Sequence, residues 1–259
     1  MDLQLQDATV VVTGAGKGIG LAVCEALAAE GARVIANVRT PSTALSALAD
    51  RASVTLVAGD ITATDTRARL VEAAGGAPHA LVNNAGIAPA RPEGFLAVPP
   101  DDWAHTFALD LFAGIEMIRA VLPGMLARGS GCVVNVGSLN ARLPDPLVID
   151  YSAAKAAFGN VAKSLSKAYG PQGIRFTSVD PGPVATDLWN GAGGVAATVS
   201  AAAGIDPAEV RTGAAGQMPT GRFSTPAEVA VLVTLLCSPR VSNVTGSSFV
   251  IDGGMAPML

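Results

Sequence analysis

The chain has 259 residues, half of them hydrophobic and only 15% charged, with a formal net charge of −4 at pH 7. This composition favours one globular domain with a large core over a disordered or fibrous chain. The weak negative charge offers no basic field for nucleic acid, and no run reaches the roughly 18 uninterrupted apolar residues of a membrane span. We therefore expect neither a nucleic-acid nor a membrane partner.

The first predicted elements are a strand in ATVVVTG (8–14), a helix in GIGLAVCEALAAEG (18–31) and a strand in ARVIANV (32–38). Further β-branched runs predict strands near 53–58, 79–83, 131–137, 174–179 and 247–251, and helical runs lie near 64–74, 101–128, 150–169 and 225–237. Apolar strands joined through helices form parallel sheets covered on both faces. The sequence thus predicts an α/β, doubly wound fold with seven parallel strands, whose ligands bind at the carboxyl ends of the strands.

Residues 184–223 interrupt this alternation, being rich in glycine and alanine with little regular pattern. An insertion of this kind after a strand is more often a binding lid than a linker when the domain continues beyond it. We therefore expect a single domain over 1–259 with a substrate lid at 184–223.

The cysteines and histidines offer no metal site. Cys24, Cys132 and Cys237 lie far apart in apolar segments, which favours buried reduced thiols, and His79 and His105 are the only histidines. The N-terminus, MDLQLQDATVVVTG, lacks the basic start and apolar core of a secretory signal. These features favour a cytoplasmic protein without a metal.

The segment TGAGKGIG (13–20) places Gly14, Gly18 and Gly20 between the first strand and its helix. Glycine lets the backbone approach a phosphate closely, and the amide groups of a helix N-terminus favour an anion. The spacing is G-x-x-x-G-x-G and lacks the Gly-Lys-Ser/Thr end of a P-loop. The loop taken alone is also consistent with a tight strand–helix turn.

Further motifs follow the later strands, namely NNAG (83–86), Ser138, YSAAK (151–155), PGPVATD (181–187) and TGSSFVIDGG (245–254). With these motifs the sequence resembles the short-chain dehydrogenase/reductase family over essentially its whole length. The resemblance implies a Rossmann fold, an NADP or NAD cofactor, and the interconversion of a ketone or aldehyde with an alcohol.

Tyr151 and Lys155 are four residues apart on a predicted helix, so their side chains share a face. An adjacent ammonium favours the phenolate and moves the pKa of the tyrosine toward neutral pH. The resemblance implies that Tyr151 exchanges a proton with the substrate oxygen while Ser138 hydrogen-bonds that oxygen. Separately, such a pair and such a serine are common structural features, but together at a nucleotide site they favour catalysis.

Asp110 stands where relatives usually have an asparagine that interrupts a helix and helps hold a water connecting the lysine to solvent. If Asp110 faces Lys155 through water, its charge raises the pKa of the lysine and opposes formation of the Tyr151 phenolate. Alternatively, its side chain lies in a helix–helix contact and the backbone carbonyl serves the water. We include Asp110 among the candidate catalytic residues.

The resemblance also implies the cofactor contacts. Asp60 corresponds to the residue whose carboxylate meets the adenine amino group, and Lys155 and Tyr151 to those near the nicotinamide ribose. The predicted cofactor site comprises Gly14, Lys17, Gly18, Ile19, Gly20, Arg39, Asp60, Ile61, Asn83, Ala85, Gly86, Tyr151, Lys155, Pro181, Gly182, Val184 and Thr186.

Val38 closes the second strand where NAD-selective relatives typically carry an acidic residue for the ribose hydroxyls. Arg39 and Lys17 could instead converge on the 2′-phosphate of NADP. Both cations could also be ordinary surface charges, and Asn37 could accept a ribose hydroxyl of NAD. We expect NADP to be preferred and keep NAD as the alternative.

The substrate is predicted only by class. Leu188, Trp189, Val195 and Met218 in the expected lid favour an apolar or acyl-bearing small molecule, including a 3-oxoacyl thioester, over a sugar phosphate. Arg142 could attract an acidic substrate or simply be solvated. A different class of protein, a non-catalytic dinucleotide sensor, is disfavoured because a sensor does not need a proton donor.

The helices near 101–128 and 150–169 carry more apolar residues than one sheet-facing stripe requires. These residues are Leu109, Phe112, Ile115, Ile118, Phe158, Val161 and Leu165. The resemblance implies a homotetramer assembled through such helices and the C-terminal strand.

Overall fold

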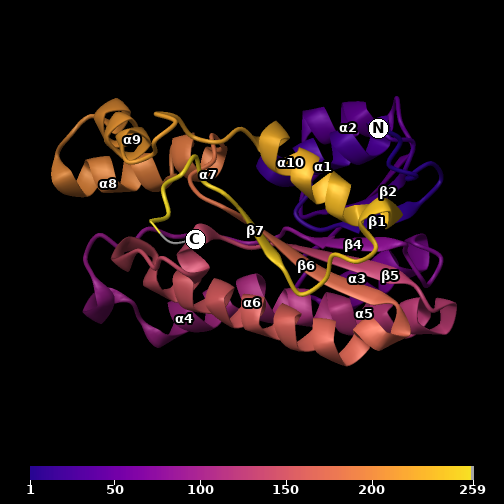
Figure 1. Cartoon of the computed structure of the whole chain (residues 1–259). Helices are drawn as coiled ribbons and strands as arrows, with labels where there is room; N and C mark the ends of the chain where they lie inside the picture. The colour runs from indigo at the N-terminus through magenta and orange to yellow at the C-terminus, as the bar shows by residue number, and fades with distance from the viewer. Residues whose placement is uncertain (258–259) are drawn as a thin grey trace.

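A computed structural model describes residues 1–257. Its centre is one parallel sheet of seven strands in the order β3-β2-β1-β4-β5-β6-β7 (Figure 1). The strands are β1 (Thr9–Val12), β2 (Arg33–Val38), β3 (Val54–Ala58), β4 (Ala80–Asn83), β5 (Gly131–Val136), β6 (Ile174–Pro181) and β7 (Ser248–Ile251). The predicted doubly wound fold is confirmed, and the strand order reverses between β1 and β4, where such folds bind ligands.

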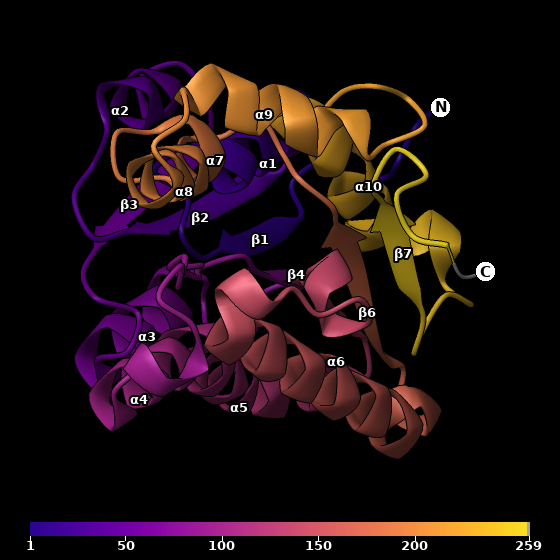
Figure 2. The same ribbon diagram turned by 90° about the vertical axis from the view of Figure 1, so that its left-hand side faces the viewer.

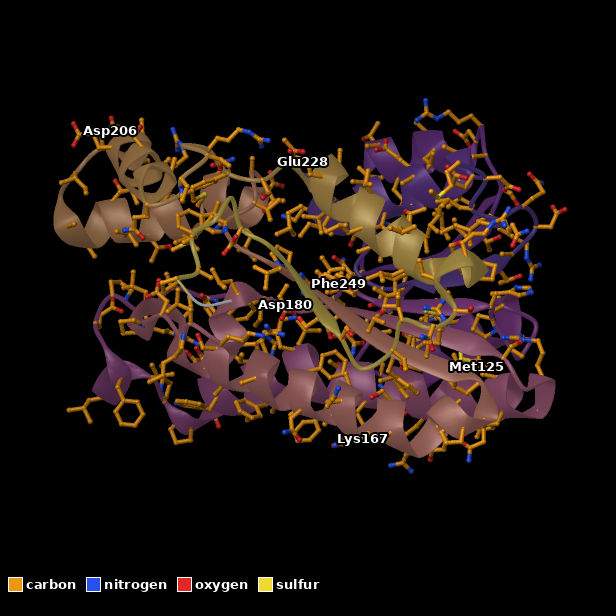
Figure 3. All side chains as sticks on the ribbon, in the orientation of Figure 1. Met125, Lys167, Asp180, Asp206, Glu228 and Phe249 are labelled. Atoms are coloured by element: carbon orange, nitrogen blue, oxygen red, sulfur yellow. The ribbon has the colours of Figure 1, made fainter. Side chains whose placement is uncertain are left out.

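Helices cover both faces of the sheet (Figure 1). One face carries α1 (Gly18–Ala29), α2 (Thr43–Ala49) and α10 (Pro226–Cys237), and the other carries α3 (Thr64–Ala73), α4 (Pro100–Phe107), α5 (Ala113–Arg128) and α6 (Ile149–Tyr169). Successive strand side chains point to opposite faces, so Val10 and Val12 pack in the core under α1 and α10 whereas Val11 packs with α5 and α6. In Figure 3, Met125 lies within the second of these cores and Lys167 projects from the outer face of α6.

The helix predicted for 101–128 is divided in the structure. A π-helical stretch, Ala108–Phe112, separates α4 from α5 and carries Asp110. Such a bulge changes which side chains face inward and is frequent at functional sites. It turns the Asp110 carboxylate into the protein, where the residue is only 2% exposed.

Helix α2 was not predicted from the sequence. Ser42 caps it, with Oγ accepting a hydrogen bond from the Leu45 amide at 3.2 Å and donating one to the Gly16 carbonyl at 2.6 Å. The cap therefore ties α2 to the glycine loop that precedes α1.

The sequence of 184–223 shows little regular pattern, but the segment forms helices. The segment contains α7 (Asp187–Asn190), α8 (Val195–Ala203) and α9 (Pro207–Gly216). Alanine is the strongest helix former, and Asp206 caps α9 by accepting a hydrogen bond from the Ala208 amide at 2.6 Å. The glycines between these helices concealed the helical pattern.

The 184–223 segment lies at the carboxyl-end edge of the sheet, on the side of α1 and α2 and facing α4 and α6 (Figures 1 and 2). A backbone bridge between Val184 and Ser224 closes its base, and the rings of Trp189 and Phe223 meet edge to face at 4.9 Å. These contacts join the two ends of the segment to each other.

Among residues 1–257, no helix is both long and apolar enough to cross a bilayer, and no group of His, Cys, Asp or Glu side chains is arranged to hold a metal. Cys24, Cys132 and Cys237 are buried free thiols, as predicted.

Candidate active site

A cavity of about 1310 Å³ opens at the carboxyl ends of the strands, between the glycine loop, the N-terminal half of α6 and the 184–223 segment. Pockets for one small ligand usually measure about 300–1,000 Å³, so this cavity has room for a dinucleotide together with a second molecule. Every candidate catalytic and cofactor residue predicted from the sequence lines it, with the single exception of Asn83.

Asn83 lies on β4 and points into the sheet, where its Nδ2 donates to Asn135 Oδ1 on β5 at 3.0 Å. Its neighbour Asn84 faces the glycine loop instead, and its Nδ2 donates to the carbonyls of Thr13 and Gly14, each at 3.0 Å. Consecutive residues at a strand end point in different directions, so the motif alone does not identify which asparagine reaches the site.

The glycine loop has no room for side chains at its glycine positions. Gly14 and Gly18 have positive φ angles of 67° and 55°. A Cβ atom at Gly14 would lie 2.8 Å from the Ala85 Cα, and one at Gly20 would clash with the Gly14 carbonyl. The loop therefore needs glycine at these positions, and the start of α1 stays open to an anion.

Beyond the glycine loop, the cavity is lined by the ends of β2 and β3, including Val38, Arg39, Asp60 and Ile61. Asp60 Oδ1 accepts hydrogen bonds from the amide and hydroxyl of Thr62, and these bonds lower the pKa of its carboxyl group. Asn37 is buried, and its Nδ2 donates hydrogen bonds to the carbonyls of Val57 and Gly59. The amide nitrogen of its side chain is therefore already bonded to the backbone of β3 and of the residue that follows it.

Lys17 does not point toward Arg39. Its Nζ lies 3.2 Å from Asp187 Oδ2 at the start of α7, and both side chains are largely exposed. This ion pair connects the glycine loop with the 184–223 segment. The adjacent Thr186 lies close to Gly18, where an added Cβ would be 3.2 Å from the Thr186 methyl group.

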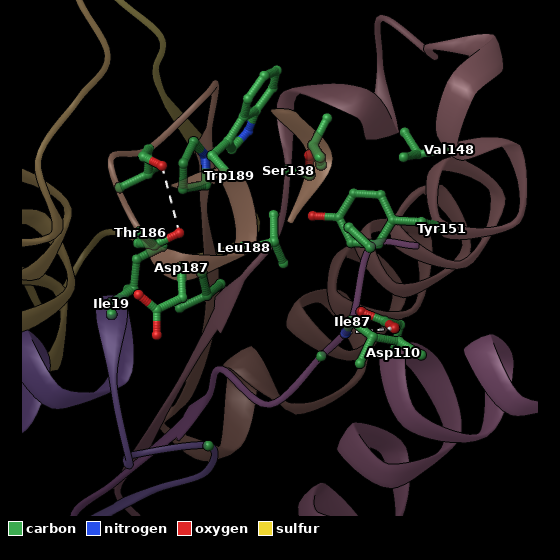
Figure 4. A pocket seen from close by; sticks show the side chains of 18 of the residues that line it. Ile19, Ile87, Asp110, Ser138, Val148, Tyr151, Thr186, Asp187, Leu188 and Trp189 are labelled. Atoms are coloured by element: carbon green, nitrogen blue, oxygen red, sulfur yellow. Dashed lines mark hydrogen bonds between the residues drawn. The ribbon is translucent and has the colours of Figure 1, made fainter. Parts of the chain in front are cut away.

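Ser138, Tyr151, Lys155 and Asp110 meet at the other end of the cavity, and Figure 4 shows the Tyr151 hydroxyl directed into it. Helix α6 places the Lys155 ammonium 5.6 Å from the centroid of the Tyr151 ring. The ammonium donates to the Val136 carbonyl at 3.2 Å and lies 3.3 Å from Asp110 Oδ1. Asp110 Oδ2 accepts a hydrogen bond from the Ile87 amide at 3.1 Å.

The contact of Asp110 with Lys155 corrects both alternatives derived from the sequence. The carboxylate meets the ammonium directly, neither across a water nor turned away into a helix–helix contact. Burial alone would lower the pKa of Lys155, but Asp110 and Tyr151 favour its charged form strongly enough to raise that pKa.

Lys155 favours the phenolate form of Tyr151 as expected, but this effect is too small to bring the pKa of Tyr151 toward neutrality. Burial raises the pKa of Tyr151, the Lys155 ammonium and the Ser138 hydroxyl offset part of this effect, and Asp110 and Asp180 raise it further. The net direction is upward. In this structure, Tyr151 therefore holds its proton at neutral pH.

Asp180 was not among the residues predicted from the sequence. It is buried at the end of β6, its Oδ2 accepts a hydrogen bond from the Ser248 hydroxyl, and burial raises the pKa of its carboxyl group. Figure 3 shows Asp180 beside β7 in the middle of the molecule. The Nε of Arg142 lies 3.8 Å from the same carboxylate, and Arg142 is absent from the cavity lining. Arg142 is thus an exposed arginine, as the solvated alternative expected, and it does not line the cavity.

Comparisons with known proteins agree with this geometry. A family model described as enoyl-(acyl carrier protein) reductase matches residues 14–256. The cis-4-hydroxycyclohexanecarboxylate dehydrogenase of Sinomonas cyclohexanicum is 36% identical, with 94% of each chain covered, and the 3-oxoacyl-[acyl-carrier-protein] reductase of Vibrio cholerae is 29% identical, with 98% of this chain and 99% of the relative covered. The crystal structure of L-sorbose reductase from Gluconobacter frateurii complexed with NADPH and L-sorbose superimposes with a TM-score of 0.91 at 29% identity, covering all of both chains.

The chain belongs to the short-chain dehydrogenase/reductase family. It is an oxidoreductase of the class that uses a nicotinamide dinucleotide and interconverts carbonyl and alcohol groups. Its site contains the directly paired Asp110 and Lys155.

Proposed function

We propose that the enzyme reduces a ketone or aldehyde, or oxidises the corresponding alcohol, with Tyr151 as the proton donor or acceptor. The observation that carries this proposal is the position of the Tyr151 hydroxyl in the cavity. Lys155 lies on the same face of α6, with its ammonium 5.6 Å from the centroid of the Tyr151 ring. Because the pKa of Tyr151 is raised, the phenol is protonated at neutral pH and can donate to a carbonyl oxygen.

Ser138 is proposed to hydrogen-bond the substrate oxygen. It follows β5 directly, and its Oγ already accepts a hydrogen bond from the Asn140 amide at 3.1 Å, which leaves its proton free to be donated. The Lys155 ammonium lies behind the tyrosine and stabilises the phenolate that forms when the proton leaves.

The residues present fit a nicotinamide dinucleotide. A bound cofactor supplies the hydride acceptor or donor for this reaction. The glycine loop would hold its phosphates, Asp60 and Ile61 its adenine, and Pro181, Gly182, Val184 and Thr186 its nicotinamide end. Two observations support this assignment. The glycine loop leaves space that a side chain at its glycine positions would occupy. The lowered pKa of Asp60 keeps its carboxylate available as a hydrogen-bond acceptor.

We propose NADP as the preferred cofactor. Val38 presents no carboxylate at the end of β2, and Arg39 is exposed at the same end of the cavity. An arginine binds a phosphate through charge-assisted hydrogen bonds, whereas an acidic residue at position 38 would repel it. Lys17 is a second cation near this end, although it contacts Asp187 in this structure.

A 3-oxoacyl thioester reductase is the second candidate. Leu188, Trp189, Val195, Val199 and Val210 give the cavity an apolar side that suits an acyl chain. The Vibrio cholerae relative carries this activity in its name.

The remaining proposals concern organisation and location. We propose that 184–223 is a substrate lid, since its helices line the cavity and its two ends are joined by the Val184–Ser224 bridge. We also propose a cytoplasmic homotetramer. Phe112 is 55% exposed and Val231 64% exposed, which favours contacts between subunits, whereas Ile118 and Phe158 belong to the core and offer no such surface.

The loss of NADPH or NADH absorbance in the presence of a carbonyl panel tests the proposed reaction. The panel contains aliphatic and cyclic ketones, ketoses, keto acids and 3-oxoacyl thioesters. We expect turnover of at least one class, with NADPH supporting the faster reaction. Tight NADPH binding without turnover of any carbonyl or alcohol would instead indicate a dinucleotide sensor.

A further inference from the structure

The charged groups that line the cavity fall into two regions. Lys17, Arg39, Asp60, His105 and Asp187 lie toward the cofactor end, and Asp110, Tyr151 and Lys155 form the reaction centre. Beyond the reaction centre, the only remaining titratable residues lining the cavity, within residues 1–257, are Asp145 and Glu209. Both are carboxylates, and they come from opposite walls, since Asp145 precedes α6 and Glu209 lies in the first turn of α9.

Among residues 1–257, no unpaired lysine or arginine lines this end of the cavity. The Lys155 ammonium is paired with Asp110 and the Lys17 ammonium with Asp187, at 3.3 and 3.2 Å. Arg142 is held near Asp180 outside the lining. Among residues 1–257, neither Asp145 nor Glu209 forms an ion pair with a lysine or arginine, and both residues are exposed at the cavity.

The rest of this region is apolar or uncharged. Figure 4 shows Val148 and Tyr151 on one wall and Leu188 and Trp189 on the other. Asn140 and Gln217 supply amide groups that can bind hydroxyl or carbonyl oxygens. A charged group placed between such walls loses water without gaining a partner, and that loss is costly.

Resting on the proposed function, we infer that the substrate of this enzyme is an uncharged carbonyl compound, and that Asp145 and Glu209 discriminate against substrates bearing a carboxylate, sulfonate or phosphate near the reacting carbon. The discrimination is repulsive: two carboxylates and apolar walls oppose an anion, while a neutral substrate uses the amides and the apolar surface. Selectivity of this kind depends on disfavouring the wrong ligand as much as on binding the right one.

Matched neutral and anionic ketones test this inference. The probes are 4-oxocyclohexanecarboxamide against 4-oxocyclohexanecarboxylate, and 4-oxopentanamide against 4-oxopentanoate, because each pair differs in charge and hardly in shape. Because two exposed carboxylates repel an anion, we expect the amide to have a kcat/KM about 10-fold or more above that of the carboxylate. The ratio should shrink at high ionic strength, since salt screens exposed charges.

The variant Asp145→Asn/Glu209→Gln removes both charges and keeps the side-chain shapes. Asparagine at position 145 retains an acceptor for the Leu147 amide, which Asp145 Oδ1 binds at 2.9 Å. We expect the amide-to-carboxylate ratio to fall to about two or below, because kcat/KM for the carboxylate rises. Glu93→Gln, an exposed carboxylate outside the cavity lining, is the matched control and should keep the wild-type ratio.

Three results would count against the inference: a carboxylate ketone used as well as its amide, a ratio unchanged in the double variant, or an anionic compound as the best substrate of the wider panel. Absence of turnover with every carbonyl would contradict the proposed reaction itself. The two failures are therefore distinguishable.

Discussion

The Asp110 carboxylate and the Lys155 ammonium form a buried ion pair, with Oδ1 3.3 Å from Nζ. The pair depends on the π-helical stretch that turns Asp110 inward and on Gly86, where any Cβ would clash with the carboxylate. Its negative charge raises the pKa of Lys155 and contributes to the raised pKa of Tyr151. Asp110 thus acts on the proton donor through its charge.

Replacing Asp110 with asparagine should shift the pH dependence of the reaction toward lower pH. Without the carboxylate, the Tyr151 phenolate is less disfavoured, so Tyr151 loses its proton at a lower pH. Carbonyl reduction, which needs the protonated phenol, should decline at a lower pH than in the wild type, and alcohol oxidation should begin at a lower pH.

The measurement is kcat/KM against pH for both proteins with one substrate and saturating cofactor. Asp101→Asn, which changes an exposed carboxylate in the first turn of α4, is the control and should leave the profile in place. Superimposable profiles for wild type and Asp110→Asn would make Asp110 a purely structural residue.

Arg39→Ala should change kcat/KM differently for NADPH and for NADH. A charge-assisted hydrogen bond contributes about 1.5–3 kcal/mol, so we expect kcat/KM for NADPH to fall about 10- to 100-fold while that for NADH changes little. Arg69→Ala, an exposed arginine paired with Asp65, is the control. Equal use of NADH by the wild type, together with no loss for NADPH in Arg39→Ala, would refute the proposed preference.

Arg91 holds the residue that directly precedes Tyr151. Its guanidinium donates to Asp150 at 2.8 Å and to Asp102 at 2.6 Å, and the Thr106 hydroxyl donates to the same Asp150 oxygen at 2.8 Å. Asp150 has no exposed surface, so Arg91→Met leaves its charge uncompensated.

Breaking a buried pair in this way costs about 3–5 kcal/mol, and we expect that loss in the free energy of unfolding measured with urea. The matched control is Arg69→Met, which breaks an exposed pair and should cost about 0–1 kcal/mol. A loss as small as that of the control would show that the Arg91 cluster does not hold α6 in place.

His79 should make the protein less stable in mild acid. Its Nδ1 accepts a hydrogen bond from the Thr9 amide at 2.8 Å, which requires the unprotonated ring nitrogen. Burial, and then the charges of Arg128 and Arg33, lower its pKa below the ordinary value of 6.5. The unfolded chain therefore binds a proton more readily, and stability present above pH 6.5 is lost as the pH falls.

Urea unfolding at pH 7.5 and pH 5.5 measures this loss. His79→Asn offers an amide oxygen as the acceptor for the Thr9 amide but does not titrate, so its stability should change less between the two conditions. An identical pH dependence in both proteins would exclude His79 as the responsible group.

Features that depend on local sequence were predictable. Runs such as VVV in β1 predict a buried strand, and the four-residue spacing of Tyr151 and Lys155 places both on one face of α6. Features set by tertiary geometry were not. The choice between Asn83 and Asn84 depends on where β4 ends, and the direct contact of Asp110 with Lys155 depends on a π-bulge. The buried Asp180 accepts its hydrogen bond from Ser248 on β7, a residue distant in the sequence.

The role of Tyr151 is the central claim, and Tyr151→Phe in a single-turnover reduction tests it most directly. Phenylalanine keeps the ring but removes the transferable proton, so the rate of hydride transfer from NADPH to a ketone should fall about 10²- to 10⁴-fold. The dissociation constant for NADPH and the melting temperature should stay close to those of the wild type. A variant that reduces the same ketone at the wild-type rate, with the same cofactor bound, would contradict the assignment of Tyr151 as the proton donor.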